Sequence, residues 1–516
     1  MINPLSGPKR VVNKLIKTFL ILKSHLHQPS YKNQEKIIFN LIERCRKTVF
    51  GRKYGFEYIH TIEDFQNLVP ISHYKDFEPR IMYMLKGEKD ICYPGKVDRF
   101  ATSSWTTWGE SKYIPVTKEW LKKSHMKWWA EALNFFCKNN PRSQFLTWKG
   151  LVIGWWFSAN PYTGEENVWF ISAILQKNTP RVIKKLIKEP QDDIAYIDNR
   201  EEKVKLVIER TAHQNITFIN GQPGWLLNFL YKTLEYTKKE NILEVWPNLE
   251  LFFRWGLPID LYKSQFTKLI PSVKMKYYQG YNASEWFFGV QDKNFADDML
   301  LLINHGTFYE FIPFEEYGKE NSKVLTLKDI EAGEEYIILL TTCSWLRRYV
   351  IGDVIKFTSI KPRRIQVAGR TKYFIDMLGE RVYLEHVEKA ILQTSKLTNT
   401  VITDYTVWPK VYEWGEVRGA HEWVIEFVKE PEDAEQFAKI LDQELGKINN
   451  YYFDERHDTK VIGMPIVHVV PQGTFYNRFK SKNKLGWQHK VPKLSNDRVV
   501  LDDLLSIIDD KNTGKD

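Results

Sequence analysis

The chain has 516 residues, of which 43% are hydrophobic, and it carries 74 Lys plus Arg against 64 Asp plus Glu. This hydrophobic content excludes an intrinsically disordered chain, and at about 150 residues per domain the length excludes a single small module. The net charge of +10 is a small excess on a long chain, without the runs of like charge that mark nucleic-acid-binding tails. We therefore expect no nucleic-acid partner, and a basic surface that attracts an anionic ligand such as a nucleotide.

The sequence contains no pattern typical of a membrane anchor, a disulfide framework or a zinc site. The most apolar N-terminal stretch, Leu15 to Leu22, is interrupted by Lys17 and is shorter than the roughly 18 apolar residues of a membrane-spanning helix. No small-residue cleavage site follows it. The four cysteines lack CxxC spacing. We expect a cytoplasmic protein without a membrane partner.

The order of apolar runs predicts an α/β protein with two domains. Between about residues 150 and 360, β-rich runs such as Ile216 to Ile219 alternate with helical runs such as Leu226 to Tyr236, which is typical of layered α/β folds with a parallel or mixed sheet. We predict a large N-terminal domain over residues 1–368 and a smaller, mobile α+β domain over residues 369–516. The elements expected in the smaller domain are a helix Glu380 to Ser395, a strand Glu422 to Val428 and a helix Asp433 to Asn449.

The first chemical motif is a hydroxyl-rich segment, ATSSWTTWGESKY, from Ala101 to Tyr113. Hydroxyls and backbone N–H groups in a tight loop can cradle phosphate oxygens, and a nearby Lys can balance their charge. The alternative is an ordinary Ser/Thr-rich surface turn.

The second motif is QGYNASEWFFG, in which Tyr281 and Glu285 flank a turn of small residues. An aromatic ring can lie on an adenine face, and a carboxylate can hold Mg²⁺ beside phosphates. The alternative is a helix start that is capped by Ser284.

The third motif is TTCSWLRRYVIGDVIKF, in which Gly352 and Asp353 stand at a predicted strand turn. An Asp in this position can accept hydrogen bonds from both ribose hydroxyls. The alternative is a plain Gly-Asp hairpin.

Two further motifs follow near the predicted domain boundary and near the C-terminus. GRTKYFIDMLGERVYLEHVEKAI begins with Gly369 and Arg370, where a hinge would lie. KNKLGWQHKVPK places Lys490 on a loop that a mobile domain could deliver to the first one.

In this order, the five motifs resemble the adenylate-forming superfamily of acyl-activating enzymes. The closer resemblance is to the auxin-responsive-promoter (Gretchen Hagen three) family of acyl acid amido synthetases, in its bacterial form. It extends over nearly the whole chain and includes ISHYKDFEPRIMYMLKGEKD and EVWPNLELFF. The resemblance implies adenylation of a small carboxylic acid by Mg·ATP, followed by attack of an amine, often an amino acid, to give an amide.

The resemblance also implies roles for individual residues. Lys490 would stabilise charge that develops at the α-phosphate, Glu285 would bind the metal, and Asp353 would hold the ribose. Arg370 would mark the hinge, and Tyr281 would lie by the adenine. The residues expected to contact the phosphates are Ser103, Ser104, Thr106 and Thr107. Lys493 stands where the family's Gln-x-Lys-x-Pro-Arg element has Arg, a conservative change that would weaken bidentate contacts.

The sequence departs from the family pattern at several positions where the family has Gly and this chain has Trp. These positions include Trp105, Trp108, Trp286, Trp345 and Trp487. Glycine serves where φ is positive or where backbone approaches a ligand closely, so an indole there should obstruct the phosphate site.

The replacing residue is always Trp, while the Ser, Thr, Glu, Asp and Lys residues of the motifs are intact. Decay of an inactive homologue would alter these residues as well. The codons GGA and UGA differ by one base. We therefore interpret these Trp residues as glycines that are encoded by UGA in a lineage that reads UGA as Gly. Returning about ten Trp to Gly would raise Gly from 27 to about 37, near the roughly 7% norm. Arg347 and Arg478 stand where the family favours Trp, which suggests a second reassigned codon.

Two alternatives to an amide-forming ligase remain open. One is a thioester-forming ligase that uses the same adenylate chemistry with a pantetheine thiol as acceptor. The other is a catalytically inactive nucleotide- or acyl-binding homologue, if the Trp residues in the loops are real. The sequence leaves open the acid, the amine and the oligomeric state.

Overall fold

The structure is a computed structural model in which the described residues form two compact units. The described residues are 18, 31–102, 112–145, 147–152, 157–158, 167–179, 181–195, 197, 200–221, 223–255, 263–319, 322–370, 374–375, 380, 382–412, 419–458, 460, 462–475, 478, 492–494, 501–502 and 504–505. One unit comprises residues 1–351 and 355–367, and the other comprises residues 352–354 and 368–516. The boundary between residues 368 and 369 stays a prediction.

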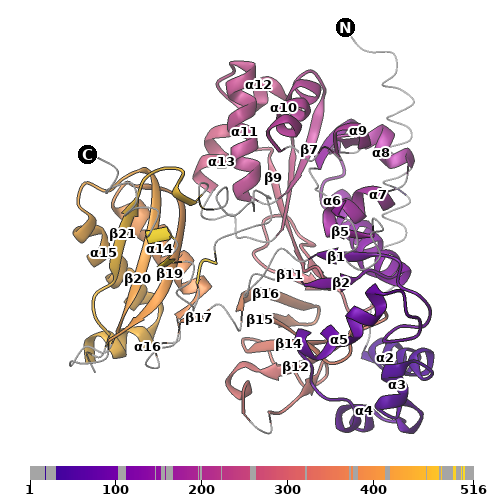
Figure 1. The fold of residues 1–516 in the computed structure, drawn as a ribbon. Coiled ribbons are helices and arrows are strands. Elements are labelled where there is room, and N and C mark those ends of the chain that lie inside the picture. The colour runs from indigo at the N-terminus through magenta and orange to yellow at the C-terminus, as the bar shows by residue number, and fades with distance from the viewer. Residues whose placement is uncertain are drawn as a thin grey trace. The chain divides into compact units, whose positions relative to one another are not determined.

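The large unit is built on a mixed sheet of twelve strands, which confirms the predicted α/β class (Figure 1). Strands β6, β3, β7, β8 and β9 are parallel neighbours, whereas β10 and β11 continue the sheet in antiparallel pairs. In spatial order the strands are β13 (Leu325–Thr326), β12 (Thr307–Pro313), β14 (Glu335–Thr342), β15 (Tyr349–Ile360), β16 (Arg363–Arg370), β11 (Met299–Leu301), β10 (Phe287–Val290), β9 (Lys276–Asn282), β8 (Leu251–Trp255), β7 (Ile216–Gly221), β3 (Lys149–Val152) and β6 (Lys188–Glu189).

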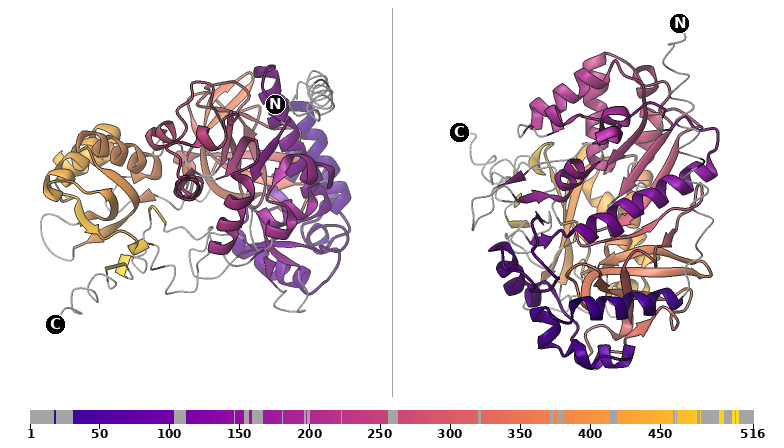
Figure 2. Two further views of the ribbon diagram at one scale, coloured as in Figure 1. Left: turned by 90° about the horizontal axis from the view of Figure 1, so that it is seen from above. Right: turned by 90° about the vertical axis from the view of Figure 1, so that its right-hand side faces the viewer.

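Helices cover the sheet of the large unit. Their bounds are α2 (Tyr31–Cys45), α3 (Val49–Lys53), η1 (Phe56–Tyr58), α4 (Ile62–Leu68), α5 (Tyr74–Leu85), η2 (Trp120–Met126), α6 (Lys127–Asn139), α7 (Ile171–Asn178), α8 (Arg181–Ile187), α9 (Asp192–Ala195), α10 (Arg200–Thr211), α11 (Pro223–Thr237), α12 (Ile242–Val245), α13 (Lys263–Leu269) and η4 (Phe314–Glu316). Figure 2 shows η2 and α6 as one continuous helix that crosses the sheet. Among the described residues, no helix combines the length and apolar character needed to cross a membrane.

The side chains of strand β8 pack against helices on both faces of the sheet. Successive side chains of a strand point to opposite faces of the sheet. Phe252 packs against Phe266 of α13, with ring centroids 5.0 Å apart. The next residue, Phe253, packs against Trp128 of α6 at 5.5 Å. The apolar run LFF is therefore buried from both sides, as expected for a central parallel strand.

Gly280 of β9 lets the helix that crosses the sheet approach closely. A Cβ atom at this position would lie 2.1 Å from Cζ2 of Trp128, whose Nε1 donates to the carbonyl oxygen of Gly289 at 2.8 Å. We expect Gly280→Ala to lower the free energy of unfolding by about 1–3 kcal/mol, because the indole must move. Urea denaturation checks this, with Gly221→Ala as the control, since a Cβ atom there meets nothing within 4 Å. Equal losses for both variants would contradict the close-approach argument.

The smaller unit consists of a three-stranded sheet with helices. The sheet has the order β19 (Val401–Val411), β20 (Gly419–Lys429) and β21 (Ile466–Val470). Phe427 of β20 packs edge-on against Phe437 of α15, with centroids 5.4 Å apart. The remaining elements are β17 (Phe374–Ile375), β18 (Val382–Tyr383), α14 (Leu384–Leu397), α15 (Ala434–Ile448), α16 (Asn450–Phe453) and η5 (Asp454–Asp458).

The predicted elements of the smaller unit are present, but their boundaries differ. The strand expected from Glu422 to Val428 extends from Gly419 to Lys429. The helix expected from Glu380 begins at Leu384, because Val382 and Tyr383 pair with Phe374 and Ile375 as a short β-ladder. Extended backbone at Tyr383 then serves as the N-cap of α14.

Candidate active site

The hydroxyl-rich segment closes a β-hairpin. Strands β1 (Phe100–Thr102) and β2 (Tyr113–Pro115) are antiparallel, with Thr102 opposite Tyr113. They belong to a four-stranded sheet with β5 (Val168–Phe170) and β4 (Phe157–Ser158). The predicted phosphate-contacting residues Ser103, Ser104, Thr106 and Thr107 lie outside the described residues. Their role in contacting the phosphates stays a prediction.

The second motif forms the connection between β9 and β10. Tyr281 is opposite Gly289 in this antiparallel pair, and Glu285 lies in the connection between the two strands. No helix begins at Ser284, so the capped-helix alternative is wrong. The chain turns here because Phe287 immediately enters β10 and packs on Trp120 and His125.

Glu285 is held in place by two aromatic residues from other elements. The hydroxyl of Tyr349 donates to Oε1 of Glu285 at 3.1 Å, and Nε1 of Trp120 donates to its backbone carbonyl at 2.7 Å. Only 9% of Glu285 is exposed. Among the described residues, no hydrogen bond engages Oε2 of Glu285. The side chain is therefore fixed, with one carboxylate oxygen available for a ligand.

Tyr281 is more enclosed than the predicted adenine contact requires. Its ring packs against Phe288 at 4.6 Å between centroids, and the residue is buried. Stacking on a base needs an open ring face, so its role beside adenine stays a prediction.

Gly352 and Asp353 lie inside a strand rather than at a turn. Both belong to β15, so the predicted strand turn and the Gly-Asp hairpin alternative are wrong. Gly352 has φ +84°, a conformation that glycine adopts without steric cost, and it interrupts the extended backbone locally. Asp353 is 2% exposed. Its proposed contact with ribose stays a prediction.

Arg348 anchors the connection between β14 and β15. Its Nε lies 3.2 Å from both carboxylate oxygens of Glu310 in β12, and its Nη1 donates to the carbonyl oxygens of Gln66 and Val69 at 2.7 Å. Arg348 has φ +43°, which is rare for a residue with a side chain. This network holds the adjacent Tyr349 in position to reach Glu285.

The C-terminal motif is described only at its end. Lys490 lies outside the described residues, and Arg370 ends β16 without a described side chain. The carbonyl oxygen of Lys493 accepts from the backbone N–H of Val407 at 3.0 Å, and its ammonium forms an ion pair with Asp404. The segment that carries Lys490 is therefore fastened to β19 three residues downstream.

The described Trp residues at family glycine positions are buried in the core. Trp286 and Trp345 are fully buried, and neither Nε1 has a hydrogen-bond partner among the described residues. Trp345 packs edge-on against Phe77 at 5.3 Å. The described non-glycine residues with positive φ do not include either of them, so the expected positive φ is absent at both positions. Trp105, Trp108 and Trp487 lie outside the described residues.

Arg347 is a buried cation without an acidic partner among the described residues. It is 1% exposed. Its Nη1 donates to the carbonyl oxygens of Thr342 and Leu346 at 2.9 and 2.6 Å, and its Nη2 donates to Sγ of Cys45 at 2.7 Å and to the carbonyl oxygen of Cys92 at 3.3 Å. Both Nη atoms also lie 3.3 Å from the carbonyl oxygen of Ser344, whereas Nε has no partner among the described residues. Burying a guanidinium without an anionic partner is costly.

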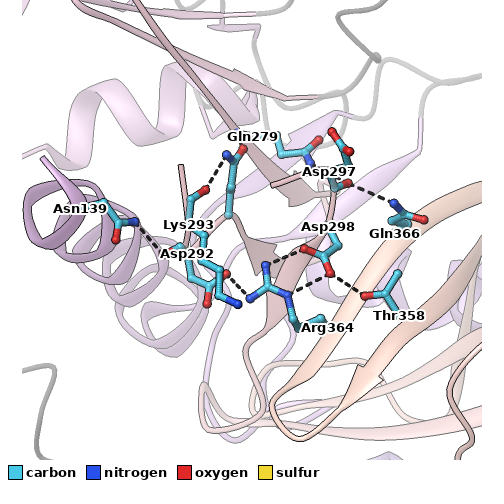
Figure 3. Close-up of polar contacts among 10 residues, drawn as sticks. Asn139, Gln279, Asp292, Lys293, Asp297, Asp298, Thr358, Arg364 and Gln366 are labelled. Atoms are coloured by element: carbon cyan, nitrogen blue, oxygen red, sulfur yellow. Dashed lines mark hydrogen bonds and ion pairs between the residues drawn. The ribbon is translucent and has the colours of Figure 1, made fainter. Parts of the chain in front are cut away.

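A second polar cluster has a structural role. Figure 3 shows Arg364 of β16 between Asp292 and Asp298, with Nη1 2.5 Å from Oδ1 of Asp292 and Nη2 2.6 Å from Oδ1 of Asp298. Thr358 also donates to Asp298 at 2.7 Å, and the Arg364 guanidinium is the main cause that lowers the pKa of Asp298. The single guanidinium of Arg364 bridges both carboxylates, so the cluster fastens the β10–β11 connection to β15 and β16.

Glu285 could hold Mg²⁺ only together with the phosphates of a bound nucleotide. Among the described residues, no group of three or more His, Cys, Asp and Glu side chains could hold a metal ion. Mg²⁺ commonly binds through one or two carboxylates together with substrate phosphates. Glu285, with one carboxylate oxygen available, suits this arrangement.

Sequence reasoning assigned no role to Tyr349 or Tyr74, although both lie in segments that carried the family resemblance. Tyr349 contacts Glu285 across 64 residues of sequence, and Tyr74 contacts Tyr113 across 39. The only sequence feature that pointed to Tyr74 was the family resemblance of the segment ISHYKDFEPR, in which it lies.

Known proteins share the fold over nearly the full chain. The chain is 21% identical to indole-3-acetic acid-amido synthetase GH3.3 of Arabidopsis thaliana, over 89% of this chain and 88% of that protein. It is also 21% identical to indole-3-acetic acid-amido synthetase GH3.8 of Oryza sativa subsp. indica, over 89% and 87%. The solved structure of GH3.15 acyl acid amido synthetase superposes with a TM-score of 0.78 at 16% identity, over 95% and 96% of the two chains. A 2-hydroxyisobutyryl-CoA ligase structure gives a TM-score of 0.60 at 13% identity, over 94% and 93%.

Three domain models of one family match this chain in sequence order. They are the GH3 family N-terminal domain over residues 25–275, the central domain over residues 300–370 and the C-terminal domain over residues 385–499. They include the hydroxyl-rich segment, the third motif and the C-terminal motif, whereas the segment from Gln279 to Gly289 lies between the first two models. The chain therefore belongs to the GH3 family.

Proposed function

We propose that this protein adenylates a small carboxylic acid with Mg·ATP and then transfers the acyl group to an amine, typically that of an amino acid, to form an amide. The observation that carries the proposal is the ordered match of all three GH3 domains, because relatives along the same length are named acid-amido synthetases. Adenylation develops charge on phosphate oxygens, so it requires positioning and electrostatic stabilisation rather than a protein nucleophile. The protein acts in the cytoplasm.

Each predicted residue has a defined task in this reaction. Glu285 holds Mg²⁺, which neutralises charge on the phosphates, and Asp353 binds the ribose. Tyr281 lies by the adenine, Arg370 marks the hinge, and Lys490 stabilises charge at the α-phosphate. The residues that contact the phosphates are Ser103, Ser104, Thr106 and Thr107.

The acceptor distinguishes this function from the main alternative. The similarity to a CoA ligase structure favours thioester formation as the second candidate. Incubating the enzyme with ATP, acids and either amino acids or coenzyme A, followed by mass spectrometry, separates the two. We expect an amide and AMP, and formation of a thioester alone would refute the amide-forming function.

We also propose that Trp105, Trp108, Trp286, Trp345 and Trp487 are encoded by UGA and are glycine in the native protein. Support comes from the sequence, in which the replacing residue is always Trp while the Ser, Thr, Glu, Asp and Lys positions of the motifs are intact. The buried indoles do not separate these positions from others, because Nε1 of Trp408 and Trp423 also has no hydrogen-bond partner among the described residues. Native glycine at positions 286 and 345 would open space beside Glu285 and Tyr349. Sequencing the gene and measuring the masses of native peptides test the proposal. UGG at these positions would refute it and would favour the inactive binding protein.

A second reassigned codon would make Trp the native residue at position 347, where the family favours Trp. We expect Arg347→Trp to raise the free energy of unfolding by about 1–4 kcal/mol, because it removes a buried charge without an acidic partner and fills the site with apolar volume. Urea denaturation measures the change. Arg52→Trp is the matched control, since Arg52 is exposed. A loss of stability in Arg347→Trp would contradict the assignment.

A further inference from the structure

Residues 70–74, which link α4 to α5, run between two parts of the candidate active site. We name this segment the 70–74 strap. The backbone N–H of Ser72 donates to the carbonyl oxygen of Arg348 at 2.9 Å, and the N–H of Val350 donates to the carbonyl oxygen of Ser72 at 2.9 Å. Ser72 thus forms a parallel bridge with Tyr349. The strap is a short extra strand beside the start of β15.

The last residue of the strap, Tyr74, contacts the exit of the hydroxyl-rich segment. Its hydroxyl oxygen accepts from the backbone N–H of Tyr113 at 2.8 Å and lies 3.4 Å from the carbonyl oxygen of Tyr113, to which it donates. Tyr113 begins β2, immediately after the connection that carries the predicted phosphate contacts. The ammonium of Lys112, in that connection, lies 4.9 Å from the ring centroid of Tyr74.

The environment of Tyr74 keeps its hydroxyl protonated. Burial is the main cause that raises its pKa, and the negative charges of Glu78 and Glu285 add to the shift. A neutral hydroxyl can donate and accept at the same time, as the two contacts with Tyr113 require.

At its other end, the strap is joined to the same ligand through Tyr349. Ser72 bridges Tyr349, and the hydroxyl of Tyr349 donates to Glu285 at 3.1 Å. One short segment therefore connects the hairpin of the predicted phosphate contacts with the carboxylate of the predicted metal ligand.

We propose that Tyr74 is a positioning residue for Mg·ATP: its hydroxyl fixes Tyr113 at the start of β2, and the 70–74 strap joins Tyr74 to Tyr349, which holds Glu285. The inference rests on the proposed function, which it deepens by assigning a residue that determines the geometry of the phosphates. A displacement of about 1 Å in such a group can cost on the order of 100-fold in rate.

Tyr74→Phe tests the assignment, because it removes the hydroxyl and keeps the ring over Lys112. We expect the Kd and KM for Mg·ATP to rise by about 10- to 100-fold, while the KM for the acid and the midpoint of urea denaturation change little. A purely structural role would instead shift the denaturation midpoint and both KM values together. Tyr83→Phe is the matched control, since Tyr83 lies on the same helix and is 49% exposed.

The outcomes separate this inference from the proposed function. If the wild-type protein shows no acid-dependent pyrophosphate exchange with any acid, the proposed function fails, and calorimetric binding of Mg·ATP still tests Tyr74. If the wild-type protein is active or binds Mg·ATP, and Tyr74→Phe equals Tyr83→Phe in its Kd for Mg·ATP, the positioning role is refuted.

Discussion

Glu285→Gln is expected to slow acid-dependent pyrophosphate exchange by about 100-fold or more while leaving the fold intact. An amide oxygen can still accept from the hydroxyl of Tyr349, so the contact at 3.1 Å is retained. What is lost is the negative charge that would hold Mg²⁺ beside the phosphates. We expect the Mg²⁺ concentration for half-maximal exchange to rise as well.

Exchange assays over a range of Mg²⁺ concentrations measure both effects. Glu334→Gln is the control, because Glu334 is exposed and lies outside the candidate site. Full exchange activity of Glu285→Gln with unchanged Mg²⁺ dependence would show that Glu285 is not the metal ligand.

Arg348→Met is expected to lower the free energy of unfolding of the large unit by about 3–5 kcal/mol. The substitution leaves the carboxylate of Glu310, which is fully buried, without its cation. It also removes the donors to the carbonyl oxygens of Gln66 and Val69. Urea denaturation measures the loss.

Lys319→Met is the matched control for this ion pair. Nζ of Lys319 lies 2.8 Å from Oε1 of Glu316, and the two side chains are 58% and 35% exposed, so separating them should cost at most about 1 kcal/mol. A loss in Arg348→Met as small as that in Lys319→Met would contradict the anchoring role of Arg348.

Local patterns predicted the elements better than their boundaries. The run Ile216 to Ile219 and the helical spacing from Leu226 to Tyr236 correspond to β7 and α11, because apolar periodicity reflects burial directly. Gly352 and Asp353 suggested a turn, yet neighbouring strands of the large sheet keep β15 continuous through them. Sheet pairing is a long-range effect that dipeptide preferences do not capture.

In the candidate site, too, local motifs were predicted and long-range contacts were not. Motif order located Glu285, but the residues that hold it, Tyr349 and Trp120, are 64 and 165 positions away in sequence. No periodicity encodes such a contact. Arg347 was singled out by resemblance alone, and only the fold revealed that it is buried without an acidic partner among the described residues.

The most direct test of the adenylation chemistry is exchange of labelled pyrophosphate into ATP by the chain with glycine at positions 105, 108, 286, 345 and 487, assayed with a panel of carboxylic acids. We predict exchange that requires both Mg²⁺ and a specific acid. A folded protein that binds Mg·ATP but supports no exchange with any acid would contradict the account and identify a binding protein instead.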